Sequence, residues 1–109
     1  MSRWVRVTEL TALEEENRPY AFEAEGEPIV LIRKGDTVYA FRDVCTHMEY
    51  PLHDGTLEDE YVIRCAYHGA RFDIRTGDVL SMPAFEPVQT YPVRITDGIV
   101  WIDVEPEAR

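Results

Sequence analysis

Short runs of apolar and aromatic residues recur along the whole chain, and turn residues separate them. In residues 20–24 the larger side chains alternate with small or charged ones, which is typical of a strand with one buried face. Helical periodicity is not sustained anywhere, and only residues 8–16 are expected to make one short helical turn, with Thr8 as its cap. The pattern predicts an all-β protein with strand runs at residues 4–7, 20–24, 29–33, 37–42, 72–74, 78–80, 88–95 and 99–104.

Three pairs of these runs have the turn chemistry of β-hairpins. Gly35 lies between residues 29–33 and 37–42, and Gly77 lies between residues 72–74 and 78–80. Glycine supplies the positive φ that a tight reversal needs. The last two runs flank Asp97-Gly98, which is among the strongest local hairpin signals. The chain is therefore expected to be built largely from hairpins.

Two segments interrupt the strand pattern, and each contains one cysteine and one histidine. Residues 43–55 carry Cys45-Thr46-His47, and residues 65–70 carry Cys65-Ala66-Tyr67-His68-Gly69. Two thiolates and two imidazoles suit either zinc or an iron–sulfur centre. A structural zinc finger usually takes each pair of like ligands from one local knuckle, whereas here each loop supplies one of each kind. A dinuclear cluster therefore fits the spacing better than a single ion.

The two motifs, together with Leu52, Gly55, Phe72 and Gly77, resemble the signature of Rieske ferredoxins, and the resemblance extends over residues 4–104. It implies the Rieske fold, an antiparallel β-sandwich with a small cluster-binding subdomain at about residues 43–85, within a single domain of residues 1–109. It also implies a [2Fe-2S] cluster as the cofactor. The cofactor-binding and metal-binding residues would be Cys45 and Cys65 on the buried iron, and His47 and His68 on the exposed iron.

Details of the second loop refine this resemblance. Gly69 is expected to let the backbone approach the cluster, and Ala66 replaces the proline that the family usually has after the second cysteine. High-potential relatives in cytochrome bc complexes carry a disulfide between the loops and hydroxyls near the cluster. This chain lacks the two extra cysteines and has Ala70 and Phe72 at the hydroxyl positions. A reduction potential near the low end of the range of roughly −150 to +300 mV for Rieske centres is therefore predicted.

Composition narrows the class of partner and the compartment. The chain of 109 residues is long enough for one core and carries 21 acidic against 11 basic residues, a net charge of −10. This charge repels nucleic acid and anionic lipid. No apolar stretch is long enough to cross a bilayer, and the first twenty residues are too acidic for a signal peptide. A cytoplasmic protein without nucleic-acid or membrane partners is expected.

The resemblance implies an electron carrier rather than an enzyme, with no catalytic residues of its own. A flavoprotein reductase would supply the electron and a terminal oxygenase would receive it, both through transient contacts with a monomer. Two alternatives remain, a small Rieske-like subunit of an assimilatory nitrite reductase and a zinc-stabilised interaction module. The third histidine, His53, is interpreted as a solvent-facing loop residue.

Overall fold

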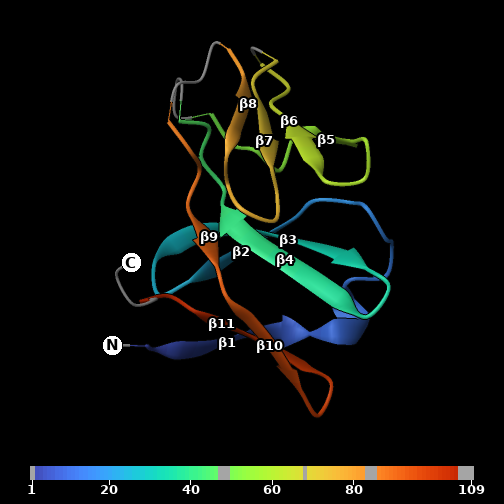
Figure 1. Ribbon diagram of the computed structural model, residues 1–109. Coiled ribbons are helices and arrows are strands. Elements are labelled where there is room, and N and C mark those ends of the chain that lie inside the picture. Colours follow the sequence, from blue (N-terminus) through green and yellow to red (C-terminus); the bar gives the residue numbers. More distant parts are fainter. Residues whose placement is uncertain (1, 47–49, 68, 83–85, 106–109) are drawn as a thin grey trace.

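The computed structural model describes residues 2–46, 50–67, 69–82 and 86–105, whose strands form three antiparallel sheets (Figure 1). The base sheet has the order β1–β11–β10, with bounds Trp4–Glu9, Ile99–Asp103 and Val93–Thr96. The central sheet has the order β2–β3–β4–β9, with bounds Tyr20–Ala24, Glu27–Lys34, Thr37–Arg42 and Thr90–Tyr91. The upper sheet has the order β5–β6–β7–β8, with bounds Thr56–Glu58, Val62–Arg64, Arg71–Asp73 and Val79–Ser81. The predicted all-β fold is confirmed.

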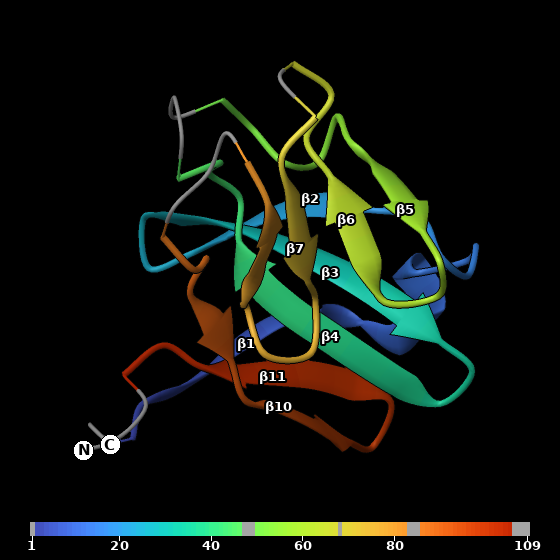
Figure 2. The same cartoon turned by 45° about the horizontal axis from the view of Figure 1, so that its top comes forward.

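The central sheet is covered on both faces, by the base sheet on one side and the upper sheet on the other (Figures 1 and 2). Its strand β3 contains four consecutive apolar residues that are all fully buried. Ile29 and Leu31 belong to the core shared with the base sheet, and Val30 and Ile32 belong to the core shared with the upper sheet. A strand buried on both faces has this continuous apolar sequence rather than an alternating one.

The first two predicted hairpins are confirmed. Strands β3 and β4 pair from Ile29 with Arg42 to Lys34 with Thr37, and Gly35 in their turn has a φ of 61°. Strands β7 and β8 pair on either side of a turn in which Gly77 has a φ of 84°.

The third hairpin is confirmed only in its second half. Residues 88–95 do not form one strand, because β9 ends at Tyr91 in the central sheet and β10 begins at Val93 in the base sheet. Pro92 stands between them and has no N–H to donate to a ladder. The turn itself is as expected, with Asp97 and Gly98 both at positive φ (52° and 75°).

One further local prediction needs correction, and one hairpin is an addition to the predicted set. The helical turn is a 3₁₀ segment at Leu10–Ala12 whose N-cap is Glu9, without a side-chain cap hydrogen bond, while Thr8 lies in β1. The hairpin of β5 and β6 was not predicted. Its turn places Asp59 and Glu60 at positive φ (43° and 66°) without using a glycine.

The upper sheet is inserted in the sequence between two strands of the central sheet. Strands β5–β8 follow β4 and precede β9. Because β4 and β9 are neighbours in the central sheet, the chain leaves that sheet and returns to it at adjacent strands. The described residues contain no helix long and apolar enough to cross a membrane.

Candidate metal centre

The two candidate loops lie at the end of the molecule that the upper sheet occupies (Figures 1 and 2). The first loop, residues 43–55, leads from β4 to β5, and the second loop, residues 65–70, joins β6 to β7. The upper sheet therefore holds the second loop directly and receives the end of the first.

The two loops each place a cysteine in the same buried apolar cluster. Cys45 and Cys65 are present as thiols, with exposed fractions of 0% and 1%. Both belong to the core between the central and upper sheets, which also includes Leu52, Ile63, Ala70, Phe72 and Ile74. His47 and His68, the two predicted imidazole ligands, lie outside the described residues. Two buried thiols within one cluster are a donor pair that suits an iron–sulfur centre.

Backbone hydrogen bonds close each loop on itself. In the first loop the N–H of Cys45 donates to the carbonyl of Tyr50 at 2.7 Å. In the second loop the N–H of Cys65 donates to the carbonyl of Ala70 at 2.8 Å, and the N–H of Gly69 donates to the carbonyl of Cys65 at 3.0 Å. Each cysteine is thus held by backbone bonds within its own loop, and its thiol is buried in the shared core.

Two glycines in these loops are required for different reasons. Gly69 has a φ of +77°, a conformation that side chains with a Cβ rarely adopt, and the guanidinium of Arg64 lies beside it. Whether Gly69 also lets the backbone approach the cluster remains a prediction. Gly55 needs space instead, because an added Cβ would lie 2.1 Å from the carbonyl oxygen of Arg64.

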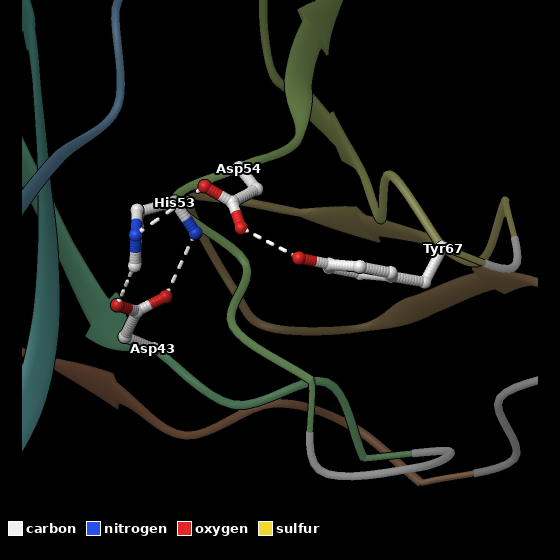
Figure 3. A network of polar contacts seen from close by, with 4 residues as sticks. All are labelled: Asp43, His53, Asp54 and Tyr67. Carbon is white, nitrogen blue, oxygen red and sulfur yellow. Dashed lines mark hydrogen bonds and ion pairs between the residues drawn. The ribbon is translucent and has the colours of Figure 1, made fainter.

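A chain of polar contacts connects the foot of the first loop with the second loop (Figure 3). Asp43 is buried and accepts the backbone N–H of His53 at 2.7 Å, while the Nδ1 atom of His53 lies 2.5 Å from the other Asp43 oxygen. The Nε2 atom of His53 lies 3.4 Å from Asp54, whose second oxygen accepts the Tyr67 hydroxyl at 2.7 Å. His53 lies in the loop with 37% of its side chain exposed, and its ring also contacts two carboxylates, which the interpretation as a solvent-facing residue did not include.

Tyr67 also contacts the first loop through its ring. It stacks on Tyr50 with ring centroids 4.4 Å apart and an interplanar angle of 21°. The pKa of Tyr67 is raised above its ordinary value, chiefly because its hydroxyl donates to the Asp54 carboxylate, and also through partial desolvation. Sequence reasoning missed this contact, and a tyrosine between the two residues of a Cys-x-x-His motif was its one visible signal.

A third segment, which follows the upper sheet in the sequence, also contacts the first loop. The hydroxyl of Thr46 donates to the carbonyl of Glu86 at 2.8 Å, forty residues along the chain.

Among the described residues, no group of three or more His, Cys, Asp or Glu side chains is placed to hold a metal ion.

Comparison with known proteins adds independent findings. Residues 3–92 match the family model of the Rieske [2Fe-2S] domain. The chain is 42% identical over 89 residues to the anthranilate 1,2-dioxygenase ferredoxin subunit of Burkholderia cepacia, covering 82% of each protein. The ferredoxin of carbazole 1,9a-dioxygenase from Nocardioides aromaticivorans IC177 is similar in structure, with a TM-score of 0.85, 35% identity and coverage of 91% of this chain and 95% of that one.

A further similar structure shows a ferredoxin together with its partner. It is a complex of reduced oxygenase and oxidised ferredoxin in carbazole 1,9a-dioxygenase, with a TM-score of 0.86, 31% identity and coverage of 97% of both chains. These matches do not favour a nitrite reductase subunit or a zinc-stabilised module.

Proposed function

Because the chain belongs to the Rieske [2Fe-2S] domain family, we propose that it is the ferredoxin of an aromatic-ring dioxygenase system. It carries a [2Fe-2S] cluster and is an electron-transfer protein rather than an enzyme. The observation that carries the proposal is the pair of buried thiols, Cys45 and Cys65, placed in one core by two loops of a fold that matches such a ferredoxin over 95% of its length.

The cluster ligands in this proposal are Cys45, His47, Cys65 and His68. The cysteine pair supports it, since both thiols are buried in one apolar cluster and come from different loops. When bound, the cluster supplies one-electron transfer, and two histidines in place of two cysteines raise its potential. Residues 1–109 form a single Rieske domain, with the cluster-binding subdomain at about residues 43–85. The insertion of β5–β8 between β4 and β9 supports this division.

The protein surroundings favour a low potential within the family. Ala70 and Phe72 are fully buried in the cysteine cluster and offer no hydroxyl donor to a cluster sulfur. Hydrogen bonds to the sulfurs are one of the means by which proteins raise the potential of such centres. We therefore place the potential near the low end of the range of roughly −150 to +300 mV.

The partners in this proposal are a terminal oxygenase, which accepts the electron, and a flavoprotein reductase, which supplies it. The ferredoxin–oxygenase complex of carbazole 1,9a-dioxygenase supports the first of these. The net charge of −10 suits transient docking on a basic surface and opposes binding to nucleic acid or anionic lipid. The protein acts as a cytoplasmic monomer.

Measurement of bound metal and redox stoichiometry tests the proposal. Protein purified anaerobically from iron-replete cells should contain two irons and two acid-labile sulfides per chain, and should take up one electron in a potentiometric titration. The variants Cys45→Ser and Cys65→Ser should each lose the visible absorbance. Thr46→Val is the matched control in the first loop, because it removes the hydrogen bond to Glu86 and no proposed ligand, and it should keep the visible absorbance. A chain that holds zinc alone, or serine variants that keep the cluster, would contradict the proposal.

A further inference from the structure

The side chain of Tyr67 joins the two loops that supply the buried thiols. It belongs to the second loop, but its ring stack and its hydroxyl hydrogen bond are both with the first loop. The ring stacks on Tyr50, and the hydroxyl donates to Asp54, four residues further along that loop. The first loop therefore holds Tyr67 at two separate points, one on the ring face and one on the hydroxyl.

The part of the first loop that holds Tyr67 is itself fixed at the foot of the loop. Asp43 is buried and binds both the backbone N–H and the ring of His53 (Figure 3). His53 precedes Asp54 directly, and its Nε2 atom lies 3.4 Å from the Asp54 carboxylate. Asp54 is consequently presented by a backbone that cannot move away without breaking contacts of a buried carboxylate.

The described backbone hydrogen bonds of Cys45 and Cys65 remain within their own loops. These bonds act within each loop, and the core shared by the two cysteines packs both loops from the inside. The Tyr67 contacts cross from one loop to the other, although both tyrosine rings are partly exposed, at 37% for Tyr50 and 48% for Tyr67. This ring pair joins the two loops that carry the buried thiols, and it is therefore well placed to control whether the loops separate.

We propose that Tyr67 is a positioning residue that latches the second loop onto the first through Tyr50 and Asp54, and so limits loss of the cluster. The inference rests on the proposed ligand set, in which each loop supplies half of the ligands. If a chelator reaches iron only when the loops separate, the rate of cluster loss follows the population of the open form. Weakening the latch should raise that rate without removing any ligand.

The test measures the decay of visible absorbance of the purified cluster-loaded protein after addition of an iron chelator. Tyr67→Phe removes the hydrogen bond to Asp54 and keeps the stacked ring, and it should release iron about five-fold faster. Tyr67→Ala removes both contacts and should release iron about thirty-fold faster. Tyr20→Phe is the matched control, because it also removes one tyrosine hydrogen bond, from the N–H of Glu15, but lies in β2 outside both loops. It should release iron at the wild-type rate.

A cycle of variants separates a latch from a general loss of stability. Asp54→Ala also removes the contact with His53, so it should release iron at least as fast as Tyr67→Phe. The double variant should be no faster than Asp54→Ala, because the bond between Tyr67 and Asp54 is already absent there. Asp54→Asn keeps an acceptor oxygen and should restore most of the slow release. The EPR spectrum of reduced Tyr67→Phe should be that of the wild type, since its ligands are unchanged.

The outcomes distinguish the latch from the function on which it rests. Wild-type protein without a cluster would overturn the proposed function. If the wild type holds a cluster and both Tyr67→Phe and Tyr67→Ala lose theirs at the wild-type rate, the latch alone is overturned. If Tyr67→Ala does not fold, Tyr67→Phe decides the matter, and a rate equal to that of Tyr20→Phe refutes the proposal.

Discussion

Gly55 offers a sharp test of how the first loop is seated on the upper sheet. It is the last residue of the first loop and directly precedes β5, opposite the end of β6. In the variant Gly55→Ala the new Cβ would lie 2.1 Å from the carbonyl oxygen of Arg64 and 3.0 Å from that of Leu52, where ordinary contacts begin at 3.4 Å. The neighbouring pair Thr56–Arg64 belongs to the β5–β6 ladder, so the backbone cannot withdraw without disturbing that pairing.

The expected cost is that of the clash, less the small gain that replacing glycine by alanine brings. Gly55 lies outside the positive-φ region, so alanine is compatible with its backbone and would by itself stabilise the protein by about 0.4–1 kcal/mol. Overpacking costs about 1–3 kcal/mol and sometimes more. Because the obstructing atoms are backbone rather than a flexible side chain, we expect a net loss of about 2–3 kcal/mol in the free energy of unfolding. For a domain of this size, that loss lowers the melting temperature by about 10–20 °C.

Thermal unfolding of the cluster-loaded protein, followed by circular dichroism, measures this effect. Gly26→Ala is the matched control, because an added Cβ there meets nothing within 4 Å, and its φ of +81° alone should cost about 1 kcal/mol. Gly55→Ala should melt well below Gly26→Ala and lose its visible absorbance more readily. If Gly55→Ala melts at or above the temperature of Gly26→Ala, the close seating of the loop on β6 is wrong.

Two further predictions concern the core and the β7–β8 turn. Phe72 is fully buried in the cluster that contains both cysteines, and Phe72→Ala should cost about 3–5 kcal/mol in urea unfolding. Leu80→Ala, at a half-exposed position of β8, should cost much less, and equal losses would contradict the core assignment. Arg75 holds the pKa of Asp73 below its ordinary value through their side-chain hydrogen bonds. A carboxyl group whose pKa is lowered in the folded state contributes its full stabilisation above the unfolded pKa of about 3.9. This contribution is lost as the pH falls through the folded-state pKa. Wild-type stability should therefore fall more steeply than that of Asp73→Asn below about pH 4, and parallel acid-unfolding curves would refute this.

Local sequence patterns predicted the elements whose chemistry is local. The run Ile29–Ile32 is apolar at every position because β3 is buried on both faces, and glycine at positive φ marks the turns at Gly35 and Gly77. The β5–β6 turn carries no such mark, since Asp59 and Glu60 adopt positive φ without glycine. The division at Pro92 depends on which sheet each half joins, which is a tertiary choice.

The candidate site divides in the same way. Cys45 and Cys65 were recognisable from their motifs, and the structure places both in one buried cluster. The contacts of Asp43 with His53 and of Asp54 with Tyr67 join residues ten and thirteen positions apart. All four residues lie in loops, where no helical or strand periodicity applies, so only the folded arrangement of the loops reveals these contacts.

Electron–nuclear double resonance on the reduced protein, grown with ¹⁵N-labelled histidine, tests the central claim most directly. The account predicts ¹⁵N couplings from two histidines to a reduced iron–sulfur centre, since His47 and His68 are the proposed ligands on one iron. A reduced centre without nitrogen coupling would show that the cluster is held by other groups, and it would contradict the account.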